Sequence, residues 1–106
     1  MKSEKKRDLE AHGWRVGDAR DFLGLAPSEA EFVEIKLALA RRLRELRERH
    51  HWTQAEFARR IASSQSRVAK MEAGDPTVSV DLLLRSLLAA GADRKELARV
   101  VGARRR

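Results

Sequence analysis

The stretch that decides the fold is TQAEFARRIASSQSRVAKMEAG, residues 53–74. Thr53 and Glu56 have the T-x-x-E spacing of a capping box, which predicts that a helix of one to two turns begins here. The run A-S-S at 62–64 interrupts this helix, and its last serine is a good N-cap for a second one. Gly74 is expected to end the second helix in a left-handed conformation. The stretch therefore predicts two short helices joined by a turn of about three or four residues.

The side chains of this stretch fit the packing of a helix-turn-helix, which needs small residues where the two helices cross. Ala58 and Ala62 are these small residues. The apolar residues expected to face inward are Phe57, Ile61, Val68 and Met71. The outward face of the second helix begins with short polar side chains, as it must if its N-terminal end is to enter the major groove of DNA. This face consists of Gln65, Ser66, Ala69 and Lys70.

A long first helix is expected ahead of this motif. Ser28 and Glu31 have capping-box spacing just after Pro27, so the helix should begin there. One apolar stripe at helical spacing should face the core, namely Phe32, Ile35, Leu39, Leu43 and Leu46. A second apolar row lies about 100° round the helix, namely Val33, Leu37 and Ala40. This second row is either a seat for the apolar residues of segment 14–25 or a surface for another chain.

Two more helices are expected after the motif. One is capped by Ser79 and ends at Gly91, and the last opens at a third capping box, Asp93 with Glu96. The predicted fold class is therefore all-α, a five-helix, phage-repressor-like helix-turn-helix domain with a long first helix and a short N-terminal extension. The expected organisation is a flexible tail (1–13), the N-terminal extension (14–27), the helix-turn-helix domain (28–102) and a basic tail (103–106).

The positive charge of the chain is concentrated in its middle third. The net charge is +7, and residues 41–70 hold nine Arg or Lys against three Glu, whereas residues 10–40 hold three basic and six acidic side chains. A positive segment between acidic or near-neutral flanks suits a polyanionic partner. On charge alone, a solvated helix face remains the alternative.

Several classes of protein are disfavoured. The chain has no cysteine, so it has neither a disulfide framework nor a thiolate metal site. No apolar run approaches the ~20 residues that span a bilayer, and the charged N-terminus is not a secretory signal, so we expect a soluble cytoplasmic protein. There is no glycine-rich phosphate loop and no recognisable catalytic motif. We expect a non-enzymatic protein with no cofactor or metal, its histidines at the surface and Trp52 in the core.

The motif resembles the phage-repressor-like (XRE, Cro/C1-type) helix-turn-helix family. The resemblance covers about residues 39–90 and rests on T-Q-x-E-F/L-A followed by S-x-S-x-V-x-x-M/L-E-x-G. Ala62 stands where the family usually has the turn glycine, and a left-handed alanine costs ~1–2 kcal/mol. The basic residues that the family carries after the recognition helix are also missing, because the run Gly74-Asp75-Pro76-Thr77 offers none.

The resemblance implies roles for individual side chains. Gln54 resembles a phosphate-binding glutamine, and Gln65 resembles a residue that reads a base edge, where glutamine can bond adenine bidentately. Ser66 and Lys70 resemble further base-facing positions, and Arg67 resembles a phosphate contact. A further pair, Arg47 and Glu72, resembles one that joins the first helix to the end of the recognition helix. The candidate DNA-binding residues are Gln54, Ser64, Gln65, Ser66, Arg67, Ala69 and Lys70.

A wider pattern, W-x-V-G-D-A-x-x-F-L-G-L at 14–25 and D-P-T-V-S-V-D-L-L-L at 75–84, is similar to HigA-type antitoxins. This resemblance implies a RelE-like (HigB-type) ribonuclease toxin as partner and autorepression of a shared operon. The second apolar row and the 14–25 segment would carry the toxin contacts. The alternatives are a stand-alone XRE-family regulator and a purely protein-binding adaptor.

Geometry also predicts a homodimer. One recognition helix contacts only a few base pairs, whereas two can read a palindromic operator in double-stranded DNA with half-sites ~34 Å apart. The expected dimer surface lies on the last two helices and consists of Leu83, Leu87, Leu97, Val100 and Val101.

Overall fold

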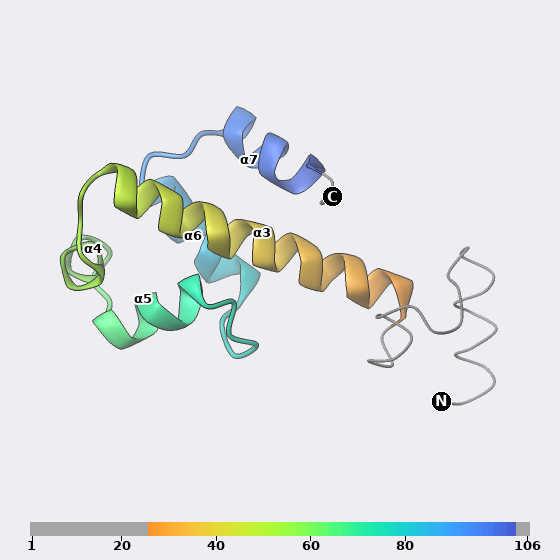
Figure 1. Ribbon diagram of the computed structural model, residues 1–106, viewed down its shortest axis with the longest axis horizontal. Helices are drawn as coiled ribbons and strands as arrows, with labels where there is room; N and C mark the ends of the chain where they lie inside the picture. The colour runs from red at the N-terminus through yellow and green to blue at the C-terminus, as the bar shows by residue number, and fades with distance from the viewer. Residues whose placement is uncertain (1–25, 104–106) are drawn as a thin grey trace. The chain divides into compact units, whose positions relative to one another are not determined.

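The computed structural model describes residues 26–103 (Figure 1). The predictions for the tail 1–13, the segment 14–25 and residues 104–106 lie outside the described residues. The described helices, in chain order, are α3 (Pro27–Arg49), α4 (Gln54–Arg60), α5 (Gln65–Glu72), α6 (Val80–Ala89) and α7 (Arg94–Gly102). Residues 26–103 contain no strand, which confirms the predicted all-α fold. The described residues divide into two units with the boundary between residues 34 and 35, inside α3.

In the first unit, α3 begins two residues earlier than the expected cap at Ser28 would place it. Pro27 is its first residue, a position that proline favours because its fixed φ suits the first turn and it has no N–H to leave unpaired. Ser28 therefore lies inside the helix instead of preceding it. The predicted core stripe is wrong at its start, because Phe32 is 54% exposed. Val33, next to it in the sequence, is also exposed.

In the second unit, the core is built by α3 from Leu39 onward together with α4, α5, α6 and the connections, and α7 packs against it through half-buried side chains. In Figure 1, α5 and α7 lie on opposite sides of the C-terminal part of α3. The core residues are Leu39, Ala40, Leu43, Leu46, Phe57, Ala58, Val68, Met71, Val78, Leu83, Leu87, Ala90 and Ala92. Ala40, from the second apolar row of α3, thus completes the protein's own core.

The burial of α6 corrects the predicted dimer surface. Leu83 and Leu87 are both 0% exposed inside their own core. A side chain that is already fully buried has no apolar area left to bury against a second copy. Leu97 and Val100 of α7 are also half-buried against the core, and only Val101 of the expected surface is exposed.

Local side-chain caps define the ends of the short helices, as predicted. Thr53 and Glu56 bond each other's backbone N–H groups, at 3.0 and 2.8 Å. Ser64 and Ser79 likewise accept from the helices that they precede. The third box is only half formed. Asp93 accepts from the backbone of Glu96 at 2.8 Å, but the Glu96 carboxylate bonds Arg42 of α3 instead.

The connections need two left-handed residues that the sequence also indicated. Ala62 has φ 53° in the turn between α4 and α5, and Gly74 has φ 70° after α5. Glycine is favoured at 74 by this conformation, and a Cβ there would also require the Leu37 side chain to move, because it would lie 2.5 Å from Cδ2 of Leu37. His51, with φ 60°, is a third such residue, which sequence analysis missed.

Candidate nucleic-acid interface

The two helices of the motif are held together by a continuous apolar contact. Phe57 and Ala58 of α4 and Val68 and Met71 of α5 are all buried. The turn between them is fixed by backbone hydrogen bonds, including one of 2.8 Å from Ser63 N–H to the Ala58 carbonyl. Because all these apolar side chains face inward, the opposite face of α5 is left to polar residues.

The predicted recognition face, formed by the candidate DNA-binding residues of α4, of α5 and of the turn between them, lies largely at the surface. Five of the seven candidate residues are exposed, namely Ser64, Gln65, Ser66, Arg67 and Lys70. Ala69 and Gln54 are half-buried. Ser64 accepts a hydrogen bond from Arg67 N–H at 3.1 Å, so its oxygen caps α5 while its hydroxyl hydrogen remains available as a donor. None of the seven lies in the core.

A chain of hydrogen bonds joins the recognition face to α3. Arg47 donates to Glu72 through two nitrogens, at 2.6 and 3.0 Å, and both side chains are largely buried. The hydrogen bonds to Glu72 raise the pKa of Arg47 above its ordinary value. Glu72 also accepts from Gln54 at 3.1 Å, and Gln54 accepts from Gln65 at 3.1 Å. The side chain of Gln65 is therefore oriented by Gln54, which is itself held by the ion pair of Arg47 and Glu72.

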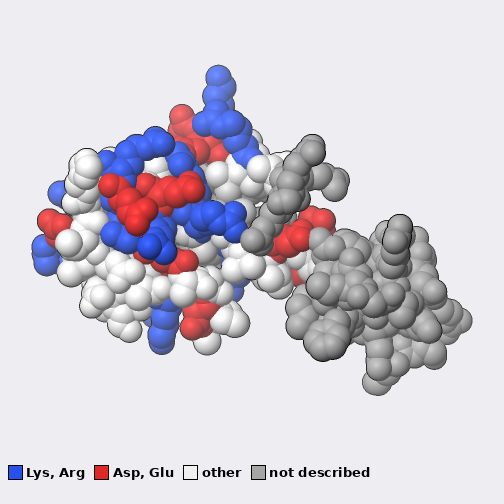
Figure 2. All heavy atoms as spheres, viewed as in Figure 1, with Lys and Arg blue, Asp and Glu red and all other residues white. Residues whose placement is uncertain are grey.

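The predicted positive segment is not one patch. Three of the arginines of α3 are neutralised by nearby glutamates: Arg42 by Glu45 and Glu96, Arg44 by Glu48, and Arg47 by Glu72. Figure 2 shows the resulting mixture of basic and acidic side chains on one face of the molecule. The exposed cations of the motif itself are Arg59, Arg60, Arg67 and Lys70.

Trp52 lies between α3 and α4 and packs against side chains from both sides of this connection. Its ring stacks on His50 with centroids 4.1 Å apart and on Phe57 at 5.8 Å, and the Arg60 guanidinium lies 4.4 Å from its centroid. His50 in turn bonds the Ala90 carbonyl at the end of α6 at 2.8 Å. Trp52 is half-buried at the edge of the core rather than inside it. Both described histidines are exposed, as predicted.

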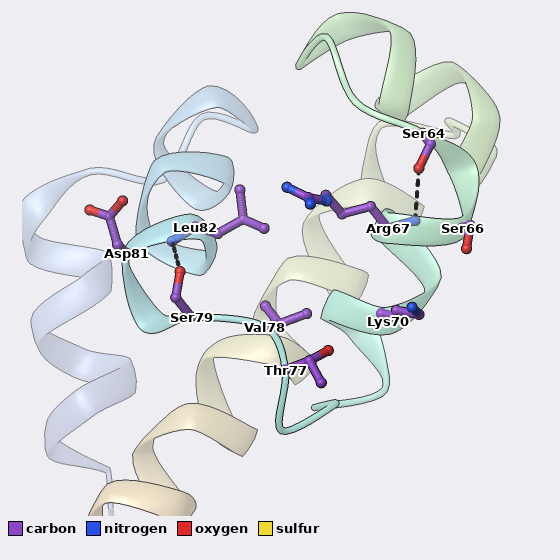
Figure 3. A pocket seen from close by; sticks show the side chains of 9 residues that line it. All are labelled: Ser64, Ser66, Arg67, Lys70, Thr77, Val78, Ser79, Asp81 and Leu82. Atoms are coloured by element: carbon purple, nitrogen blue, oxygen red, sulfur yellow. Dashed lines mark hydrogen bonds between the residues drawn. The ribbon is translucent and has the colours of Figure 1, made fainter.

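A groove of about 550 Å³ runs beside the recognition face (Figure 3). Its first wall comes from α5 and its cap, and Figure 3 shows Arg67 reaching from this wall toward the start of α6. Its second wall comes from the α5–α6 connection and the first turn of α6, and sequence analysis did not identify it. The lining residues are Ser64, Ser66, Arg67, Lys70, Thr77, Val78, Ser79, Asp81 and Leu82.

A buried helix pair that presents the N-terminal end of its second helix defines the helix-turn-helix class of DNA-binding folds. Comparison with protein families agrees, since a family model described as a helix-turn-helix domain matches residues 38–100, more than half of the chain. The chain belongs to this helix-turn-helix family, which is XRE-like in the broad sense. No curated protein and no solved structure matches the chain significantly.

Between residues 26 and 103, no group of three or more His, Asp or Glu side chains is placed to hold a metal ion. None of the five described helices combines the length and apolar character needed to cross a bilayer.

Proposed function

We propose that this protein is a sequence-specific DNA-binding transcriptional repressor that binds a palindromic operator as a homodimer. The observation that carries the proposal is the Gln54–Gln65 hydrogen bond at the exposed start of α5. A base-reading side chain must be held still to discriminate between bases. Gln65 has this support, because Gln54 is itself tied to the buried pair of Arg47 and Glu72.

The roles of the other residues follow from their chemistry. Gln65, with its carbonyl oxygen free to accept, suits the adenine edge, and Lys70 suits guanine. The Ser66 hydroxyl suits a further base edge. Arg67 and the hydroxyl of Ser64 suit phosphate oxygens, which contribute affinity without sequence information. Ala69 leaves room for close approach to the base edges. Gln54 acts mainly by orienting Gln65.

The dimer interface is proposed where apolar side chains remain exposed on the last two helices. Leu88 of α6 is 52% exposed and Val101 of α7 is 45% exposed. Neither is committed to the protein's own core, in contrast to Leu83 and Leu87. Both are therefore available to contact a second copy.

The test is selection of duplexes from a randomised pool with the full-length protein. The proposal predicts enrichment of a palindrome whose half-site centres are ~34 Å apart, or about one turn of DNA. Enrichment of no sequence above the starting pool, with binding insensitive to salt, would contradict it and favour a protein-binding adaptor.

A second candidate function adds a partner to the same protein. We propose that it is the antitoxin of a HigBA-like pair, which neutralises a RelE-like ribonuclease toxin and represses the shared operon. The supporting observation is that α3 extends eleven residues ahead of the family match and exposes Phe32 and Val33 there. Copurification with the product of the adjacent reading frame tests this. A solitary gene, or a neighbour that does not bind, would leave a stand-alone XRE-family regulator.

A further inference from the structure

Among the described Lys and Arg residues of the second unit, Lys36 is the most buried. It is only 9% exposed, and its Nζ donates to the carbonyl oxygen of Pro76, 40 residues later, at 3.2 Å. Burying an ammonium group is costly unless it is paired. Two groups of the α5–α6 connection (residues 73–79) offset this cost. They are the carbonyl of Pro76, which accepts the hydrogen bond, and the carboxylate of Asp75, which interacts electrostatically with Lys36.

Leu37, the residue after Lys36, contacts the same connection near its start, at Gly74. Leu37 lies against Gly74 so closely that a Cβ there would be 2.5 Å from Cδ2 of Leu37. Two consecutive residues of α3 therefore fix the connection at Gly74 and Pro76. The connection is also braced internally, because Asp75 accepts hydrogen bonds from the backbone and the hydroxyl of Thr77, at 2.8 and 2.6 Å.

The connection determines where the second wall of the groove stands. Thr77 and Ser79 belong to the part of the connection that comes just after Pro76, and they line that wall opposite α5. The segment 74–79 contains no Lys or Arg, and the Thr77 hydroxyl already donates its hydrogen to Asp75. The group that this segment offers to a phosphate is therefore the hydroxyl of Ser79, whose oxygen accepts from Leu82 N–H and whose hydrogen remains available. A hydroxyl acts only within hydrogen-bond distance, about 2.5–3.0 Å, whereas a cation attracts phosphate over many ångströms. A wall that binds phosphate through a hydroxyl must therefore be placed more precisely than a wall of basic residues.

We infer that Lys36 is a positioning residue of the DNA interface, which holds the wall formed by Thr77 and Ser79 at the spacing from α5 that a DNA strand requires. This inference rests on the proposed DNA-binding function. Lys36 acts through the Pro76 carbonyl and does not itself touch DNA. Its substitution should change affinity without changing the number of phosphates neutralised.

The described residues contain three lysines, which make a matched set for testing this. Lys36 holds the connection, Lys70 lines the groove, and Lys95 is exposed on α7. Each is replaced by methionine in the full-length protein, which removes one charge and keeps a similar length. Binding to the duplex enriched by the wild-type protein is measured across a series of salt concentrations, and folding is checked by circular dichroism.

Lys36→Met is expected to weaken binding about fivefold, the effect of roughly one lost hydrogen bond, with the wild-type dependence of log K on log salt. Lys70→Met is expected to reduce that slope by about 1, and Lys95→Met to bind as the wild type does. The inference is overturned if Lys36→Met binds like Lys95→Met, or if its salt slope falls as that of Lys70→Met does.

If Lys36→Met loses helical structure, Lys36→Gln takes its place under the same criteria, because it is neutral, polar and too short to keep the connection at its present distance. If the wild-type protein enriches no duplex at all, the proposed function fails, and this inference fails with it. A wild-type protein that binds and a Lys36 variant that binds equally well reject the inference alone.

Discussion

The amide nitrogen of Gln65 lies 3.1 Å from Oε1 of Gln54, so the first exposed residue of α5 is hydrogen-bonded to the first residue of α4. The two helices of the motif are thus joined on their polar side as well as through their apolar contact. Gln54 also donates to Glu72, so its own side chain is held in place. Substitution of either glutamine should therefore change the orientation of the other side chain.

The Gln54–Gln65 pair should behave as one unit in binding. Gln54→Ala frees the Gln65 side chain and is expected to weaken operator binding by about 0.5–1.5 kcal/mol. Gln65→Ala is expected to cost about 1–3 kcal/mol at the base pair that it reads. The double variant should lose less than the sum of the two, as measured in a double-mutant cycle. Strict additivity would mean that Gln54 does not orient Gln65.

Arg67 should contribute affinity without specificity. Arg67→Ala is expected to weaken binding to all duplexes alike and to reduce the salt slope by about 1, because one fewer phosphate is neutralised. The control is Arg44→Ala, which removes an exposed arginine of α3 that is paired with Glu48. The salt slope of the control should equal that of the wild type. A loss confined to the selected operator would instead assign Arg67 to base reading.

The ion pair of Arg47 and Glu72 should dominate the polar contribution to stability. Arg47→Met leaves the Glu72 carboxylate, 5% exposed, without its charged partner, at a cost of about 3 kcal/mol in the free energy of unfolding. The matched control, Arg85→Met, breaks a pair with Asp81 in which both side chains are at least 75% exposed, so about 0–1 kcal/mol is expected. Urea denaturation of both variants gives the comparison. Equal losses would contradict this account.

Two of the residues with positive φ, Ala62 and Gly74, should respond oppositely to exchange of glycine and alanine. Ala62→Gly relieves the strain of a positive φ and is expected to stabilise the protein by about 1 kcal/mol. Gly74→Ala introduces that strain and a clash with Leu37, so a loss of about 2 kcal/mol or more is expected. Thermal unfolding measures both changes. A stabilising Gly74→Ala would show that the connection is not held as described.

Features set by residues close together in the sequence could be predicted. The caps at Thr53, Ser64 and Ser79, the left-handed Ala62 and the outward face of α5 each depend on a few neighbouring side chains. The pairing of Arg47 with Glu72 was also anticipated, but only through resemblance to a family. Local pattern was enough to locate one wall of the groove.

Features set by distant residues could not be predicted. The spacing of Asp93 and Glu96 indicates a capping box, and nothing local reveals that Arg42 takes the Glu96 carboxylate. The apolar pattern of α6 does not distinguish a core leucine from an interface leucine, so Leu83 and Leu87 were misassigned. The bond from Lys36 to Pro76 spans 40 residues and has no sequence signature.

The central claim is that Gln65, presented by α5, reads a base in the major groove. It is tested most directly by selecting duplexes from the same randomised pool with the wild-type protein and with Gln65→Ala. The account predicts that the variant still enriches the palindrome but loses its base preference at one position in each half-site. Identical enriched sequences from the two proteins would contradict it.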